Sequence, residues 1–311
     1  MLELKSDSCI EERDKPLNNA AENQTWTLLS VLKEAAAYLE LHKIGQPRLN
    51  AEQILSHMLG ISRIECYLQF EKPLKIAERE QYKVLLRRRA GHEPLQYITG
   101  ETEFMSLPFK VTTDVLIPRP ETEILVEKAI DRARQKSKKE FTILDIGTGS
   151  GCIAVSLASF LTHARITAID QSEPALRIAK ANAILNTVSD RIVFQHYDIM
   201  VPLDRKELGS FDLIVSNPPY IRTEVLKNLD PEIKDHEPVT ALDGGPDGLN
   251  FYKQYAMVLP DCLRPSGAIF LEIGADQGHD VIEIFKNGPW ADIRIFQDLA
   301  GLDRVVMLEY A

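Results

Sequence analysis

The sequence predicts an α/β protein in which a small all-helical domain precedes a seven-stranded, mostly parallel sheet. Two observations lead to this prediction. From about residue 141 to 310, short apolar runs alternate with amphipathic helical segments, which is typical of a parallel sheet with helices on both faces. Residues 25–92 instead show only helical periodicity. A chain of 311 residues is long enough for one large and one small domain.

Residues 25–92 are expected to form four helices, because apolar residues recur there at spacings of three and four. Pro47 should end the first helix. Asn50 and Ser62 should cap the second and third, since their side chains can accept backbone N–H groups. The fourth is expected over residues 76–90.

Residues 93–120 are expected to form a β-hairpin linker before a second domain, 121–311. Here Arg119 stands between two prolines, so it is either a positioned side chain or part of a stiff linker followed by a helix start. The expected strands of the linker are 96–100, 104–111 and 115–117.

Seven strand candidates follow, with helices between most of them. The last two strands have no long crossover between them, so they should be antiparallel. The expected strands are 141–146, 165–169, 192–196, 211–215, 267–273, 293–297 and 304–309, and the expected helices are 121–134, 152–161, 173–186, 248–263 and 276–286.

Composition indicates a cytoplasmic protein, which we expect to be a monomer. A net charge of −10 disfavours extensive non-specific binding to nucleic-acid phosphates. No apolar run approaches a membrane span, and the four cysteines are scattered without metal-ligand spacing. We therefore expect no membrane contact and no metal. Residues 1–24 are polar and aperiodic, which predicts a flexible extension.

A proline-stiffened turn, Asn217-Pro218-Pro219-Tyr220, follows the apolar strand 211–215. Two consecutive prolines force the backbone out of the sheet in an extended form. The Asn217 side-chain carbonyl and the Pro218 backbone carbonyl are then close acceptors, each able to take one N–H of a planar amino group, and Tyr220 offers a flat face for stacking. The turn thus predicts methylation of an NH2 group, unless it only caps a strand.

Three further sites at strand ends predict a nucleoside cofactor. Gly147-Thr148-Gly149-Ser150-Gly151 joins the strand 141–146 to a helix, where glycines allow close approach of a ligand. Asp170 ends the next strand and suits the hydroxyls of a ribose. Asp198 and Ile199 follow the third and suit an adenine. Each aspartate alone could instead be a helix cap or a solvated strand end. The glycine spacing differs from the dinucleotide pattern, so S-adenosylmethionine is favoured over NAD.

These residues resemble a known family. Asp145 to Gly151 with Asp170 resembles the cofactor site of class I (Rossmann-like) methyltransferases, and Asn217 to Tyr220 resembles the signature of those that methylate amino groups. The stretch from Gln96-Tyr97-Ile98 to Pro118-Arg119-Pro120-Glu121-Thr122-Glu123 resembles the HemK/PrmC family, the peptide chain release factor glutamine methyltransferases. Later similarities are Glu237-Pro238, Gly248-Leu249 and Asp298-Leu299-Ala300-Gly301.

The resemblance implies methylation of N5 of the glutamine in the Gly-Gly-Gln motif of release factors, with S-adenosylhomocysteine as the second product. It implies a helical domain that docks the release factor. Residues 147–151, Asp170, Asp198, Ile199 and Asn217 would bind the cofactor, and residues 217–220 would bind the glutamine, with Asn217, Pro218 and Tyr220 catalytic. The family often has an aromatic residue at the position of Ile199, so stacking on the adenine would be lost here.

Other functions remain open from the sequence. A ribosomal-protein glutamine methyltransferase would use the same chemistry, although its relatives diverge in the stretch matching residues 120–123. An adenine-N6 methyltransferase acting on DNA or RNA would need a basic groove, which the acidic balance disfavours. A binding protein without catalysis is disfavoured by the intact turn at Asn217.

Overall fold

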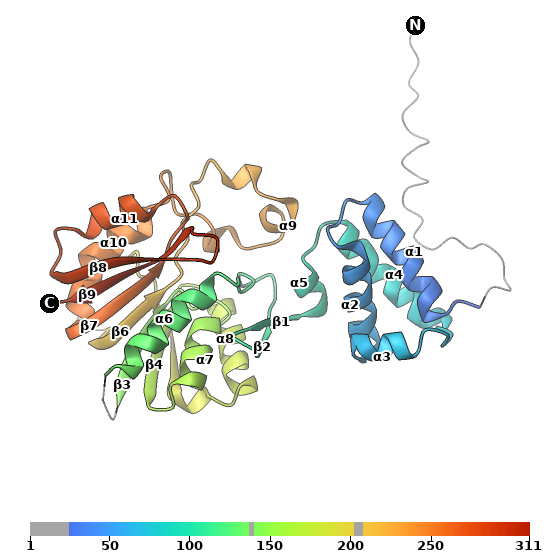
Figure 1. Cartoon of the computed structure of the whole chain (residues 1–311), viewed down its shortest axis with the longest axis horizontal. Helices are drawn as coiled ribbons and strands as arrows, with labels where there is room; N and C mark the ends of the chain where they lie inside the picture. The colour runs from blue at the N-terminus through green and yellow to red at the C-terminus, as the bar shows by residue number, and fades with distance from the viewer. Residues whose placement is uncertain (1–24, 137–139, 202–207) are drawn as a thin grey trace, which may run out of the picture. The chain divides into compact units, whose positions relative to one another are not determined.

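The computed structural model describes residues 25–136, 140–201 and 208–311, and it divides into two compact units (Figure 1). The division falls between Thr99 and Gly100. Most of the predicted linker, from Gly100 onward, falls in the second unit. The extension predicted for residues 1–24 lies outside the described residues. None of the described helices is long and apolar enough to cross a membrane.

The first unit consists of helices packed around one apolar core. Its helices are α1 (Leu28–Leu41), α2 (Pro47–Leu59), α3 (Arg63–Leu68), α4 (Ile76–Ala90) and α5 (Leu95–Thr99). Leu32, Ile54 and Leu86 bring the first, second and fourth helices into this core. Ser62 caps α3 as predicted, because its hydroxyl accepts the backbone N–H of Glu65, while the Glu65 carboxylate accepts the backbone N–H of Ser62.

Two predictions in this unit are wrong. Asn50 does not cap α2, because Pro47 begins that helix and Asn50 lies within its first turns. Its side chain instead donates to the carbonyl of Gly45 and accepts from Arg89 Nε at 2.7 Å. Residues 96–100 do not form a strand, because the carbonyl of Pro94 accepts backbone N–H groups that start α5.

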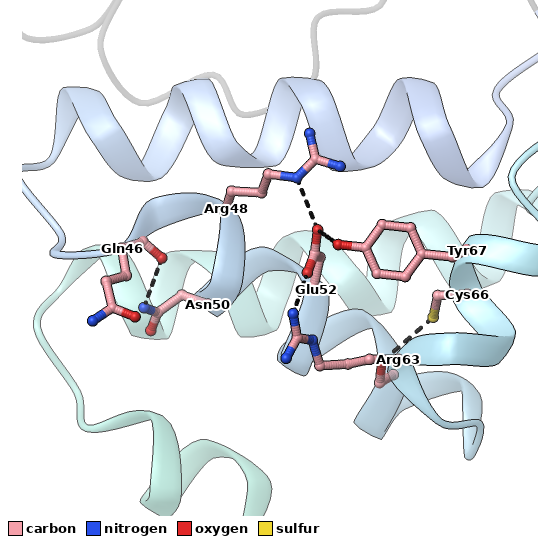
Figure 2. Close-up of polar contacts among 8 residues, drawn as sticks. Gln46, Arg48, Asn50, Glu52, Arg63, Cys66 and Tyr67 are labelled. Carbon is pink, nitrogen blue, oxygen red and sulfur yellow. Dashed lines mark hydrogen bonds and ion pairs between the residues drawn. The ribbon is translucent and has the colours of Figure 1, made fainter.

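A buried carboxylate connects α2 to α3 in the helical unit (Figure 2). The Glu52 side chain is 3 % exposed and accepts hydrogen bonds from Arg48 Nε (2.9 Å), Arg63 Nη2 (2.9 Å) and the Tyr67 hydroxyl (2.6 Å). Burial opposes ionisation, but these three donors outweigh it and hold the pKa of Glu52 below its ordinary value. Glu52 therefore acts as an ionised junction between two helices.

The second unit begins with a hairpin of β1 (Glu101–Phe104) and β2 (Leu107–Lys110). Its turn places Met105 and Ser106 at positive φ, the geometry of a tight hairpin. The predicted hairpin strands, 96–100 and 104–111, differ from the observed ones. Residues 95–99 form α5, and the turn of the hairpin lies inside the second predicted strand. Residues 115–117 form no strand, although Val115 and Ile117 are buried.

The sheet has the predicted seven strands in the order β5-β4-β3-β6-β7-β9-β8. The first five in this order are parallel, and β9 runs antiparallel to both β7 and β8, as predicted for the last pair. The strands are β3 (Phe141–Ile146), β4 (Ala164–Asp170), β5 (Ile192–His196), β6 (Phe211–Ser216), β7 (Leu263–Glu272), β8 (Trp290–Gln297) and β9 (Asp303–Tyr310).

Helices cover both faces of this sheet (Figure 1). Alternate residues of a strand face opposite sides, so Ile143 packs in one core with α6 (Thr122–Arg134), α7 (Cys152–Phe160) and α8 (Glu173–Leu185). Leu144 packs in the other with α10 (Asn250–Val258) and α11 (Gly278–Phe285). The segment between β6 and α10 contains the short α9 (Pro231–Lys234).

The strand order fixes where a ligand binds. From β3 the chain moves outward through β4 to β5, then returns to place β6 on the other side of β3. The crevice at the carboxyl ends of β3 and β6 is therefore the topological switch point, the usual ligand site of open α/β sheets.

Candidate functional site

A pocket with an empty volume of about 760 Å³, its open mouth included, lies at these strand ends. Its wall brings together most of the predicted site residues: Gly147, Gly149, Asp170, Asp198, Ile199, Asn217, Pro218 and Pro219. Three predicted residues, Thr148, Ser150 and Gly151, are not part of this wall, and Tyr220 lines a neighbouring pocket.

The loop after β3 uses its glycines in two ways. Gly147, Gly149 and Gly151 all have positive φ, which side-chain-bearing residues rarely adopt. A Cβ on Gly147 would meet no protein atom within 4 Å, whereas one on Gly151 would lie 3.0 Å from the Cβ of Ala179. Gly147 therefore leaves room in the pocket, and Gly151 allows α7 and α8 to pack closely.

A hydrogen bond between Asp145 and Thr148 stabilises this loop. Asp145 is fully buried, and its Oδ2 accepts a hydrogen bond from the Thr148 hydroxyl at 2.6 Å. Burial raises its pKa to about 7, and its other oxygen, Oδ1, has no hydrogen-bond partner among the described residues. Asp145 lines neither pocket, so it stabilises the loop through Thr148 and does not form part of the pocket wall.

Asp170 ends β4 and holds the glycine loop. Its Oδ2 accepts the backbone N–H of Gly149 at 2.8 Å, and its Oδ1 accepts that of Ser172 at 2.8 Å. Burial nevertheless raises its pKa. Hydroxyl donors arriving from a ribose would offset part of this desolvation, since each carboxylate oxygen has a further lone pair.

The end of β5 supplies an apolar slot next to a carboxylate. Ile199 is 5 % exposed, and its carbonyl accepts a hydrogen bond from Gln254 Nε2 of α10 at 2.9 Å. Phe251 of the same helix and Tyr197 also line the pocket. Asp198 Oδ1 accepts the backbone N–H of Met200. Apolar side chains beside a carboxylate would suit an adenine, and Tyr197 and Phe251 add aromatic side chains to the pocket wall although position 199 is aliphatic.

The turn after β6 is held by hydrogen bonds to both sides. The Ser216 hydroxyl donates to the carbonyl of Ile146 at 2.8 Å, which ties β6 to β3 just before the turn. Asn217 Nδ2 donates to the Thr122 hydroxyl at 3.2 Å, and the Tyr220 hydroxyl donates to Glu272 at 3.3 Å. The turn is thus fixed through α6 and β7.

A second pocket, with an empty volume of about 550 Å³, adjoins the first. Asn217 and Pro218 line both pockets, while Tyr220, Arg119 and Glu272 line only the second. A group in one pocket can therefore meet a group in the other across the turn.

Arg119 is an anchored side chain at the edge of the second pocket. Its Nη2 forms an ion pair with Glu237 and lies 2.7 Å from each of the two carboxylate oxygens. This pair ties the segment between β6 and α10 to the residues just before α6.

Sequence reasoning missed Thr122 and Glu272 as site residues. Glu272 is 2 % exposed, and burial raises its pKa to about 7. It ends an apolar strand, as Asp170 does, so the rule that singled out Asp170 would have found it too.

A seven-stranded Rossmann-like sheet with these two pockets defines a class I methyltransferase. Residues 30–100 match the family model "PrmC N-terminal domain", and residues 121–230 match "Methyltransferase small domain". The chain belongs to the family of release factor glutamine methyltransferases, because it matches relatives of that name along most of their length.

The relative from Geobacter sulfurreducens is 42 % identical, over 91 % of this chain and 96 % of its own length. The relative from Chlorobaculum tepidum is 40 % identical, over 91 % of this chain and 97 % of its own length. Among solved structures, the catalytic domain of hMettl16 is 17 % identical with a TM-score of 0.53, over 76 % of this chain and 83 % of that chain. At this identity the likeness shows the fold alone.

Proposed function

We propose that this protein transfers a methyl group from S-adenosylmethionine to the side-chain N5 of the glutamine in the Gly-Gly-Gln motif of peptide chain release factors. The observation that carries the proposal is the position of Asn217 and Pro218 in the walls of both pockets. This turn is where a bound amide and a methyl donor would meet. Membership of the release factor glutamine methyltransferase family supports the choice of substrate.

The first pocket suits the cofactor. Gly147 and Gly149 leave room for its methionine part, Asp170 accepts the ribose hydroxyls, and Asp198 with Ile199 holds the adenine. When bound there, S-adenosylmethionine supplies an electrophilic methyl group and becomes S-adenosylhomocysteine.

The second pocket suits the glutamine side chain. An amide nitrogen is a poor nucleophile because its lone pair is delocalised, so alignment and electrostatics must supply most of the rate. The Asn217 side-chain carbonyl and the Pro218 backbone carbonyl each accept one N–H of the substrate amide. These acceptors stabilise the positive charge that develops on the substrate nitrogen, and Tyr220 packs against the amide plane. Water takes the proton that the nitrogen then loses.

The helical unit docks the release factor in this proposal. Every residue lining the two pockets belongs to the second unit, so the helical unit is not needed to build the site. Its role is then to bind the body of the protein substrate.

A substrate competition tests the proposal. The protein is incubated with labelled S-adenosylmethionine and an equimolar mixture of a release factor, ribosomal proteins and adenine-containing duplex DNA. We expect the label in the release factor, on the peptide that contains Gly-Gly-Gln. Label in a ribosomal protein or in DNA at a higher rate would assign a different substrate.

A further inference from the structure

Three side chains form a hydrogen-bonded chain from the turn into the interior of the second unit. Asn217 Nδ2 donates to the Thr122 hydroxyl at 3.2 Å, and that hydroxyl donates to Glu272 Oε2 at 2.6 Å. Thr122 and Glu272 are both 2 % exposed. They come from the start of α6 and the end of β7, so the chain connects three separate elements at one point.

The carboxylate sets the direction of this chain. An ionised carboxylate only accepts hydrogen bonds, so the single proton of the Thr122 hydroxyl must point at Glu272. The oxygen of Thr122 is then left as an acceptor, and it pairs with the NH2 side of the Asn217 amide. Because the oxygen and nitrogen of an amide point in different directions from its carbon, pairing Nδ2 with Thr122 leaves Asn217 Oδ1 as the amide atom that can accept from another donor.

We propose that Thr122 and Glu272 are positioning residues that hold Asn217 with its oxygen presented to the substrate amide. The inference rests on the proposed function, because only a substrate with N–H donors requires that orientation. With the amide of Asn217 reversed, an NH2 group would face the NH2 group of the glutamine, and no hydrogen bond would form between them.

Protonation of Glu272 would remove the constraint that orients the hydrogen bonds from Asn217 through Thr122 to Glu272. A neutral carboxyl can donate to Thr122, whose hydroxyl can then donate to Asn217 and favour the reversed amide. The Glu272 carboxyl accepts from the Thr122 and Tyr220 hydroxyls and is exposed to the charges of Arg304 and Glu121. The Tyr252 hydroxyl donates to the Glu272 backbone carbonyl. Burial dominates over the Arg304 charge and keeps the pKa of Glu272 near 7, so the orientation should weaken as the pH falls through that value.

The first test compares Thr122→Val with Thr122→Ser. Valine keeps the shape of threonine but has no hydroxyl, whereas serine keeps the hydroxyl. We expect Thr122→Val to lower kcat toward a release factor by about tenfold to a hundredfold, because misplacing one preorganised group costs this order. Thr122→Ser should stay within about threefold of wild type. Both should keep the wild-type affinity for S-adenosylhomocysteine in calorimetry and unfold cooperatively.

The second test is the pH profile of Glu272→Gln. The kcat of the wild type should fall as the pH is lowered from about 8 to about 6. The kcat of the glutamine variant, whose residue 272 cannot ionise, should stay constant over the same range. A merely structural glutamate would leave the two profiles parallel.

The outcomes separate this inference from the proposed function. If wild type methylates the release factor and Thr122→Val does so within about twofold, the positioning role is wrong and the function stands. Parallel pH profiles for wild type and Glu272→Gln lead to the same conclusion. If wild type methylates no release factor, the proposed function fails, and the inference fails with it.

Discussion

Substituting the glycines of the loop after β3 should separate cofactor binding from folding. We consider Gly147→Ala and Gly151→Ala, with Gly301→Ala as the control. All three glycines have positive φ, between 71° and 80°. A Cβ on Gly301 would meet no atom within 4 Å, and Gly301 lies outside both pockets, so that variant reports the backbone strain alone.

The structure predicts different sizes of effect. A left-handed conformation costs an L-residue about 1–2 kcal/mol, and the stiffer unfolded chain returns about 0.4–1 kcal/mol. Gly301→Ala and Gly147→Ala should thus each lose about 1 kcal/mol of unfolding free energy. Gly151→Ala adds overpacking against Ala179, whose Cβ and Cα would lie 3.0 and 3.1 Å from the new methyl group. That contact costs a further ~1–3 kcal/mol.

Thermal unfolding and calorimetry with S-adenosylhomocysteine measure the two effects. At about 2–4 °C per kcal/mol for a domain of this size, Gly151→Ala should melt roughly 5–15 °C below wild type. Gly147→Ala should melt close to Gly301→Ala but bind at least about tenfold more weakly, since 1.4 kcal/mol of lost contact is tenfold. Equal melting temperatures for Gly151→Ala and Gly301→Ala would refute the packing argument. Wild-type affinity in Gly147→Ala would refute the cofactor assignment.

Four other variants test separate parts of the account. Asn217→Ala should lower the methylation rate by about 10²–10³, because it removes a preorganised acceptor, and wild-type turnover would exclude the turn as the active site. Asp170→Ala should weaken binding of S-adenosylhomocysteine by about 1.5–3 kcal/mol through loss of charge-assisted hydrogen bonds, and unchanged calorimetric affinity would refute the ribose role. Glu52→Gln should destabilise the helical unit at pH 7 by about 2–3 kcal/mol. Since the folded-state pKa of Glu52 is lowered, the difference in melting temperature should vanish as the pH falls through that pKa, and a difference independent of pH would contradict it. A chain beginning at Gly100 should bind S-adenosylhomocysteine and methylate a short Gly-Gly-Gln peptide as full length does, but act at least about tenfold more slowly on whole release factor; equal rates would show that the helical unit does not dock the substrate.

The central strands of the sheet were predictable because β3 and β6 are buried along nearly their whole length. A strand with both faces covered is a continuous apolar run, and β6 is buried at every residue. In short segments, the apolar pattern does not distinguish a helix from a strand. Tyr97 and Ile98 are both buried in α5, but two apolar neighbours fit a strand equally well. Pro47 was interpreted only as a helix end, although proline also favours the first position of a helix.

The site was predictable only where one strand end carried a recognisable residue type. Asp170 and Asn217 follow apolar strands, and the switch-point rule brings them together. Thr122 and Glu272 lie 150 positions apart in the chain, and nothing in their local sequence indicates that they share a hydrogen bond. That contact depends on the packing of α6 against β7, which periodicity alone does not specify.

The most direct test of the account maps the methyl group on the substrate itself. Two otherwise identical release factors, one with Gly-Gly-Gln and one with Gly-Gly-Glu, are incubated with the protein and labelled S-adenosylmethionine, and the label is located by peptide fragmentation. The account predicts label on the side-chain nitrogen of the Gly-Gly-Gln glutamine and none in the glutamate variant, which lacks the two N–H groups that Asn217 and Pro218 would accept. Equal labelling of both factors, or label at any other residue, would contradict it.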